Sequence, residues 1–225
     1  MITDPCRPAF RLGPSVLAAV VTTSAALLSA PAQVASAQAC PDVEVMFARG
    51  TGEPPGVGGI GGAFVNAVRG RAGGRSVGVY GVNYPASGDF GNPGFRRTFQ
   101  DGIGDERGHI QFMAANCPNT RMVVGGYSQG AALTGDMTSG GVSPDAANHV
   151  AAVALFGKPS PNWMRTFGNP PVVIGPQFAG KTIDLCAPGD NICDGAPGGP
   201  PNGAHGAYPF NGMVGQAADF AVGHL

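Results

Sequence analysis

Charged residues are scarce in this 225-residue chain, where Asp, Glu, Lys and Arg together make up 12%. The formal net charge is −1, and no basic run occurs that could attract nucleic acid or an anionic membrane surface. We therefore expect no nucleic-acid partner. Much of the surface must consist of glycine, proline, serine, asparagine and small apolar groups, which suits a compact extracellular protein or one that seeks an interface.

Long apolar runs are also lacking, apart from one near the N-terminus. Two arginines precede the apolar stretch 16–30, and a small-residue cleavage site follows at 35–37. This order is typical of an export signal, and the stretch is short for a membrane span. We therefore predict a signal peptide at residues 1–37. Residues 38–225 are expected to be secreted without a stable membrane anchor, either free or associated with the cell wall.

Cysteine is sparse as well, with five residues, of which Cys6 lies in the predicted signal. The four that remain form an even number, which in an exported chain argues for two disulfides. Three connectivities are possible, and we favour Cys40 with Cys117 and Cys186 with Cys193. Free buried thiols or a metal site are less favoured, because the spacing of the last two cysteines lacks the close pairs of zinc ligands.

Apolar runs of strand length alternate with helix-like segments along the rest of the chain. The strand-like runs are 43–48, 76–82, 122–126, 150–156 and 181–186. The helix-like segments are 61–69, about 101–116, 131–138 and 212–222. Several strands are continuously apolar, which is typical of strands covered on both faces. The pattern predicts one α/β domain, a three-layer α/β/α sandwich around a central, mainly parallel five-stranded sheet.

A serine flanked by glycines stands between one of these strands and the next helix. Residues 126–130 read Gly-Tyr-Ser-Gln-Gly, follow the apolar run 122–124 and precede helix formers at 131–133. A turn this sharp strains the backbone at the serine, and side chains two residues to either side would collide, so glycine is needed there. A chance match is conceivable among 38 glycines. The strand, turn, helix order nevertheless favours Ser128 as a hydrolase nucleophile.

A nucleophilic serine needs a histidine base and a carboxylate, which on an α/β sheet follow in the order serine, acid, histidine. Three histidines precede Ser128, follow it too soon or lie next to the chain end: His109, His149 and His224. His205 remains as the predicted base. It lies on the segment 187–209, which is rich in glycine, proline and asparagine, and loops of that length in compact domains are usually functional.

Three carboxylates lie between the serine and this histidine: Asp184, Asp190 and Asp194. Asp190 lies within the eight-residue ring that a Cys186–Cys193 disulfide would close. Because a carboxylate that orients an imidazole must be held in place, we predict Asp190 as the acid. Asp194, just outside the ring, is the alternative, and Asp184 in a strand-like run is expected to have a structural role.

Together these residues resemble the cutinase family of secreted serine esterases, including the cutinase-like proteins of mycobacteria. The resemblance covers essentially the whole chain after the signal. Its marks are Phe47-Ala48-Arg49-Gly50-Thr51, the serine motif, the Cys186 to Cys193 loop with Asp190, and His205. It implies a small α/β-hydrolase fold with Ser128 as nucleophile, Asp190 as acid and His205 as base. It also implies the two disulfides favoured above.

The oxyanion that forms during ester hydrolysis requires hydrogen-bond donors placed in advance. One expected donor is the backbone N–H of Gln129, the residue after the nucleophile. The resemblance implies the second at Thr51, where fungal members of the family have a serine whose hydroxyl adds to the backbone donor. Threonine keeps the hydroxyl but restricts its rotamer. The backbone donor is therefore expected, and the contribution of the Thr51 side chain stays open.

The sequence thus predicts a monomeric, secreted carboxylic-ester hydrolase for short- to medium-chain acyl esters that works through an acyl-enzyme. It is expected to need no cofactor or metal, to take an ester or lipid as substrate, and to contact a lipid interface. Because the resemblance also reaches acetylxylan esterases, a carbohydrate deacetylase is one alternative. A catalytically silent binding or antigenic protein on the same scaffold is another, since fold does not determine function.

Two further features are less specific. Residues 56–61 fit the G-x-G-x-x-G pattern of dinucleotide sites, but two prolines separate them from the preceding strand and no acidic residue has the expected offset. We interpret them as a flexible loop beside the oxyanion site. Five apolar residues could line an acyl site near the histidine or serve as ordinary packing. They are Ile192, Ala196, Pro197, Phe210 and Met213.

Overall fold

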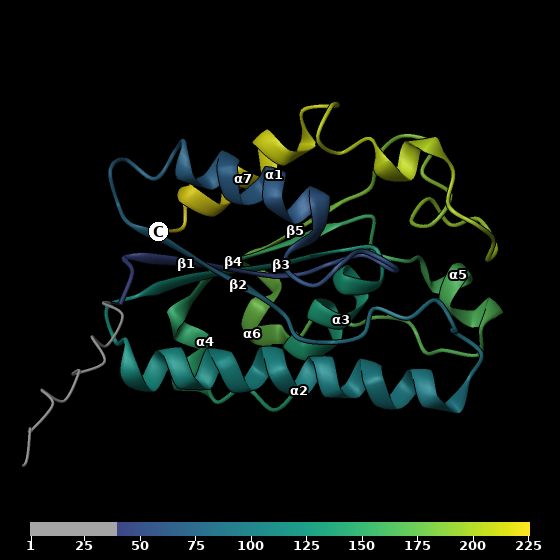
Figure 1. Cartoon of the computed structure of the whole chain (residues 1–225), viewed down its shortest axis with the longest axis horizontal. Coiled ribbons are helices and arrows are strands. Elements are labelled where there is room, and N and C mark those ends of the chain that lie inside the picture. The colour runs from purple at the N-terminus through teal and green to yellow at the C-terminus, as the bar shows by residue number, and fades with distance from the viewer. Residues whose placement is uncertain (1–39) are drawn as a thin grey trace, which may run out of the picture. The chain divides into compact units, whose positions relative to one another are not determined.

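The computed structural model describes residues 40–225, which form a five-stranded sheet between two layers of helices (Figure 1). The strand order is β2-β1-β3-β4-β5, and all neighbouring strands are parallel. The strands are β1 (Val43–Ala48), β2 (Val77–Gly81), β3 (Arg121–Tyr127), β4 (Val150–Phe156) and β5 (Thr182–Leu185). The predicted α/β/α sandwich is confirmed. The predicted signal peptide, residues 1–37, lies outside the described residues.

Helices cover both faces of the sheet (Figure 1). One face carries α1 (Gly58–Arg69) and α7 (Met213–Val222). The other carries α2 (Pro93–Asn116), α3 (Gln129–Thr138), α4 (Pro144–His149) and α6 (Pro176–Ala179). Successive side chains of a strand point to opposite faces, so Val45 and Phe47 pack with α1 and α7, whereas Met46 packs with α2 and α3. Both faces are apolar, which explains the continuously apolar strands.

Capping residues explain helices that the sequence analysis missed or began too late. Ser143 and Ser160 each precede a proline, and their hydroxyls accept hydrogen bonds from backbone N–H groups of α4 and of α5 (Pro161–Thr166). Serine at the cap with proline at the first helical position is a favoured helix start. Similarly, the Asn92 side chain accepts from Gly94 N (2.7 Å), and α2 begins at residue 93 rather than at about 101.

The glycine-rich segment after β1 is more ordered than the sequence suggested. Its residues 58–61 form the first turn of α1, so the interpretation of 56–61 as a flexible loop is wrong for these residues. The Glu53 carboxylate accepts hydrogen bonds from Gly50 N (2.6 Å) and Gly59 N (2.7 Å). A Cβ at Gly61 would lie 2.5 Å from the Phe47 ring. The glycines therefore allow close packing against β1.

Two disulfides join Cys40 to Cys117 and Cys186 to Cys193, the pairs favoured from the sequence. The first connects the residues before β1 with the C-terminal end of α2, and the second closes the loop after β5. Within residues 40–225, none of the helices has the length and apolar character required to cross a membrane.

Candidate active site

The residues singled out from the sequence follow the carboxyl ends of different strands. Thr51 follows β1, Ser128 follows β3, Asp190 lies in the loop after β5, and His205 lies on the short 3-10 helix η1 (Gly203–Gly206). Because all five strands are parallel, their carboxyl ends meet at one edge of the sheet. Ligands of open α/β sheets bind at this edge.

Ser128 lies on a strained turn between β3 and α3. Its backbone has φ 55° and ψ −117°, a conformation that non-glycine residues rarely adopt. A Cβ at Gly126 would lie 2.2 Å from the Gly130 carbonyl oxygen, and one at Gly130 would lie 2.0 Å from the Ala48 carbonyl oxygen. Both glycines are therefore needed for α3 to begin directly after the serine, as the motif predicted.

Asp190 and His205 form a buried pair, with exposed fractions of 0% and 3%. His205 Nδ1 lies 2.9 Å from both carboxylate oxygens of Asp190. The carboxylate also accepts from the Ile192 N–H (3.0 Å) and the Tyr208 hydroxyl (2.5 Å). Burial acts to raise the pKa of Asp190, but these hydrogen bonds outweigh it and lower the pKa below its usual value. The carboxylate therefore stays ionised and can hold a proton on Nδ1.

Tyr208 is a site residue that the sequence analysis did not identify. It is fully buried, and its hydroxyl accepts from Ala187 N (3.1 Å) while it donates to Asp190. Burial and the adjacent carboxylate raise the pKa of Tyr208, so the hydroxyl remains a donor. A tyrosine three residues after His205 is a weak signal in the sequence, because nothing local indicates what its hydroxyl contacts.

The two other candidate acids lie apart from the histidine. Asp194 is exposed and accepts a hydrogen bond from Ala196 N (2.9 Å). Asp184 lies 3.2 Å from Lys158 Nζ. The structure therefore brings only Asp190 of the three into contact with His205. Among residues 40–225, no cluster of three or more His, Cys, Asp or Glu side chains could hold a metal ion.

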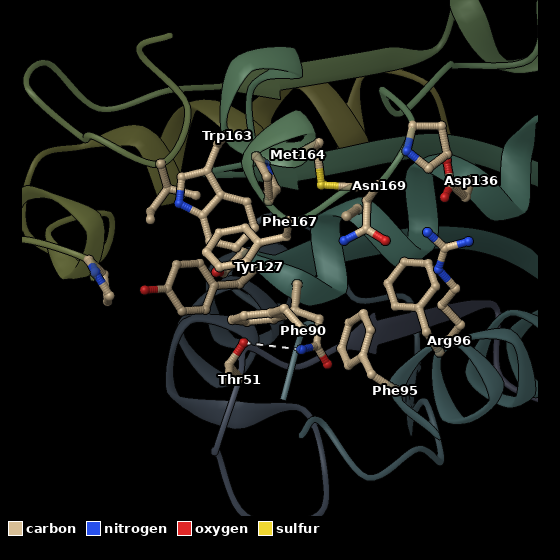
Figure 2. Close-up of a pocket in the computed structure, with 18 of the residues that line it drawn as sticks. Thr51, Phe90, Phe95, Arg96, Tyr127, Asp136, Trp163, Met164, Phe167 and Asn169 are labelled. Atoms are coloured by element: carbon tan, nitrogen blue, oxygen red, sulfur yellow. Dashed lines mark hydrogen bonds between the residues drawn. The ribbon is translucent and has the colours of Figure 1, made fainter. Parts of the chain in front are cut away.

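Thr51 and Gln129 lie together beside the serine. Gln129 Nε2 donates to Thr51 Oγ1 (3.3 Å), the contact drawn as a dashed line in Figure 2, and to the Ser87 carbonyl oxygen (2.7 Å). Gln129 is also the first residue of α3, where a backbone N–H has no acceptor within its own helix. Because Thr51 Oγ1 accepts from Gln129, its own proton is free for another acceptor.

A cavity of about 650 Å³ extends from these residues. Thr51, Ser128, Gln129 and His205 line it at the sheet edge. Six large apolar side chains line it beyond Ser128: Phe90, Phe95, Phe99, Trp163, Met164 and Phe167. All of them except Phe99 are labelled in Figure 2. This volume lies in the usual range for small-molecule sites, about 300–1,000 Å³.

Two segments far apart in the sequence close this cavity. The Phe90 ring lies 5.3 Å from the Trp163 ring and 5.5 Å from the Phe167 ring, between centroids. Arg96 Nη2, on the first turns of α2, donates to the Gly168 carbonyl oxygen (2.8 Å) just after α5. The wall thus depends on α5 and on the start of α2, both absent from the elements predicted from the sequence.

The residues considered from the sequence for an acyl site have different surroundings. Of the five, only Ile192 lines the cavity. Met213, the first residue of α7, packs against the core between the sheet and the helices α1 and α7, and Phe210 is 89% exposed. Four of the five residues therefore do not line an acyl site and are packed or exposed elsewhere.

A parallel sheet between helical layers, with a serine on a strained turn at its carboxyl edge, is the architecture of the α/β hydrolases. The family model Cutinase matches residues 39–225, and the chain belongs to the cutinase family. It is 47% identical to carboxylesterase Culp1 of Mycobacterium tuberculosis, covering 93% of this chain and 94% of that protein.

Two solved structures share the fold. A Trichoderma reesei cutinase in complex with a phosphonate inhibitor has 36% identity and a TM-score of 0.65, covering 82% of this chain and 76% of its own. An acetyl xylan esterase has 25% identity and a TM-score of 0.66, covering 83% and 99%. With carboxylesterases and cutinases as its relatives, the protein is a carboxylic ester hydrolase.

Proposed function

We propose that the protein hydrolyses acyl esters through an acyl-enzyme, with Ser128 as nucleophile, His205 as base and Asp190 as the acid that orients His205. One observation carries the proposal: His205, which is held by the buried Asp190, lines the same cavity as the strained serine. The chain order serine, acid, histidine matches the order expected on an α/β-hydrolase sheet.

In the first half of the reaction, Ser128 Oγ attacks the ester carbonyl carbon and transfers its proton to His205 Nε2. Asp190 keeps Nδ1 protonated and stabilises the imidazolium that forms. The imidazolium then protonates the leaving alkoxide, and an acyl-serine remains. Water activated by His205 attacks this ester, and the proton returns to Ser128 as the acid product leaves.

The oxyanion formed in each half is stabilised by the backbone N–H of Gln129 and by Thr51. The hydrogen bond from Gln129 Nε2 to Thr51 Oγ1 (3.3 Å) supports a role for the threonine hydroxyl, because it orients the oxygen and leaves the proton to donate. Loss of one such donor costs about 100- to 1,000-fold in kcat in other hydrolases.

The acyl group is proposed to be a short to medium apolar chain. The likeness to an acetyl xylan esterase keeps a carbohydrate deacetylase as the second candidate. An acetyl group, however, would leave most of a 650 Å³ cavity and its aromatic wall unused. Hydrolysis rates of p-nitrophenyl esters from acetate to palmitate distinguish the two. A maximum at acetate, with acetylated xylan as a better substrate, would favour the deacetylase.

Secretion is part of the proposal. The two disulfides support it, because disulfides persist in oxidising compartments outside the cytosol. Residues 1–37 would supply the export signal. We further propose a monomer that meets its ester or lipid substrate at an interface. Mass spectrometry of protein recovered from culture medium tests export, since it should begin near residue 38.

The decisive experiment compares the wild-type protein with Ser128→Ala. The variant should lose all turnover of p-nitrophenyl butyrate while its circular dichroism and melting temperature stay near wild type. Turnover retained by the variant would remove Ser128 from the mechanism. An inactive wild-type protein on every chain length would favour a catalytically silent binding protein instead.

A further inference from the structure

The cavity is apolar in its middle and polar at the end away from the catalytic residues. Figure 2 places Thr51 and Tyr127 on one side, Arg96 and Asp136 on the other, and aromatic rings such as Phe90 between them. Gln100 and Asn169 also line the cavity. An acyl chain on Ser128 would therefore follow the aromatic wall and then meet charged and amide groups.

Asp136 lies on α3, the helix that begins directly after Ser128. It follows Ser128 by eight residues, and eight residues of α-helix span about 12 Å. The Asp136 side chain is half-buried, and no hydrogen bond to its carboxylate occurs among residues 40–225. Burial raises the pKa of Asp136 to about 6, against an opposing effect of Lys158. At neutral pH it is therefore an ionised carboxylate that depends on water for its solvation.

A second cavity of about 360 Å³ begins at this residue. Gln100, Asp136 and Pro170 line both cavities. Val173, which also lines the second cavity, is 61% exposed. The second cavity therefore lies at the surface. Asp136 thus stands where a longer chain would pass from the first cavity into the second.

We propose that Asp136 sets the upper limit of acyl-chain length, because an apolar chain that passes it must strip water from its carboxylate. The proposal rests on the proposed function of Ser128. Leaving a charged group without water or a hydrogen-bond partner costs more than the roughly 1.4 kcal/mol that corresponds to a tenfold change in rate. Chains that end before Asp136 do not meet this cost.

Two of the three cations near Asp136, Arg96 and Lys158, are engaged elsewhere. Arg96 donates to the Gly168 carbonyl oxygen (2.8 Å), and Lys158 Nζ lies 3.2 Å from Asp184 Oδ2. Arg107 lines the second cavity and packs against Gly141. None of them forms an ion pair with Asp136 among the described residues. Protonation of Asp136 is therefore the change that removes the charge between the two cavities.

The first test replaces Asp136 with leucine or asparagine and measures kcat/KM for p-nitrophenyl palmitate and butyrate. The palmitate-to-butyrate ratio should rise at least about tenfold in Asp136→Leu and less in Asp136→Asn. Butyrate hydrolysis should stay within about twofold of wild type, since a short chain does not reach Asp136. Asp101→Leu, the same change at an exposed position of α2, is the matched control and should leave the ratio unchanged. An unchanged ratio in folded Asp136→Leu would overturn the proposal.

The second test varies the pH and uses Asp136→Asn as its control. In the wild-type protein the palmitate-to-butyrate ratio should rise between pH 8 and pH 5 as Asp136 becomes neutral, and it should be flat in Asp136→Asn. A pH dependence of the chemical step is common to both substrates and cancels in the ratio. A flat wild-type ratio would overturn the proposal.

A third measurement separates this proposal from the proposed function. Ser128→Ala protein, with and without Asp136→Leu, is titrated with p-nitrophenyl butyl ether and p-nitrophenyl hexadecyl ether. These ethers have the chain lengths of the ester substrates and are not hydrolysed. The leucine should strengthen binding of the hexadecyl ether only. Binding that does not respond to the leucine overturns the role of Asp136, whereas missing turnover in the wild-type protein overturns only the proposed function.

Discussion

Two buried carboxylates on different parts of the molecule behave in opposite ways. Asp190, in the disulfide-closed loop, accepts hydrogen bonds from His205, Tyr208 and a backbone N–H, and its pKa is lowered despite burial. Glu106, in the interface of α2 and α3, accepts one hydrogen bond from Thr134 (2.9 Å), and burial raises its pKa to about 8. Burial alone therefore does not decide the charge of a carboxylate, because the number of donors around it does.

The largest expected effect comes from removing the charge at Asp190. Asp190→Asn should lower kcat by about 10³- to 10⁴-fold, because the amide no longer holds His205 in the required tautomer. Asp194→Asn is the control, since Asp194 is exposed and bonds only its own loop. Steady-state hydrolysis of p-nitrophenyl butyrate measures both. The reverse order of the two losses would reassign the acid.

The two disulfides should separate stability from activity. They close loops with sequence separations of 77 and 7 residues. In the chain-entropy account, replacing Cys40 and Cys117 by serine costs about 4.5 kcal/mol of unfolding free energy, and replacing Cys186 and Cys193 costs about 2.5 kcal/mol. Activity should follow the opposite order, because only the second disulfide encloses Asp190.

Urea unfolding and ester hydrolysis of the two double variants, measured well below their melting temperatures, test this prediction. Equal activity in both variants would show that the small ring does not hold the acid in place. Greater loss of stability from the small ring would contradict the loop-entropy account for this protein.

The buried Glu106 predicts that stability falls as pH rises. The folded state binds this proton up to about pH 8, whereas the unfolded chain releases it near the ordinary value of 4.5. Neutral Glu106 therefore stabilises the folded state fully below pH 4.5. This stabilisation falls by about 1.4 kcal/mol per pH unit as the pH rises to about 8. Glu106→Gln should remove this slope in urea unfolding between pH 6.5 and pH 8, above the pKa of about 6 of Asp136. Asp190, whose pKa is lowered, makes stability fall as pH decreases, and does so only at acidic pH. Its effect therefore does not overlap with that of Glu106. A wild-type stability that is constant over this range would contradict the prediction.

The smallest expected effect concerns Tyr208. Tyr208→Phe removes one donor to Asp190 and should lower kcat/KM about tenfold, since hydrogen bonds to charged groups contribute about 1.5–3 kcal/mol. Tyr80→Phe is the matched control, because the Tyr80 hydroxyl also bonds a carboxylate, that of Asp105 (3.0 Å), away from the cavity. Equal loss in the two variants would indicate a general effect on stability instead of a role in positioning Asp190.

Much of the fold was predictable, because its signals lie within a few residues of one another. The runs 43–48 and 150–156 form strands with the predicted bounds, and the glycines around Ser128 are explained by contacts within that turn and the strand beside it. The starts of α4 and α5 were also readable in principle, since each is a serine followed by proline. Short helices of this kind have too few turns to show an apolar periodicity.

The sequence by itself determined the strand order along the chain, the strained serine and the candidate acid and histidine, since these depend on local sterics and on chain order. Only the tertiary structure decided what surrounds them. The aromatic wall joins Phe90 with Trp163 and Phe167, more than seventy residues away. The protonation of Asp190, Asp136 and Glu106 likewise depends on donors and burial supplied by distant elements. Such contacts arise from packing, which no local pattern of residues specifies.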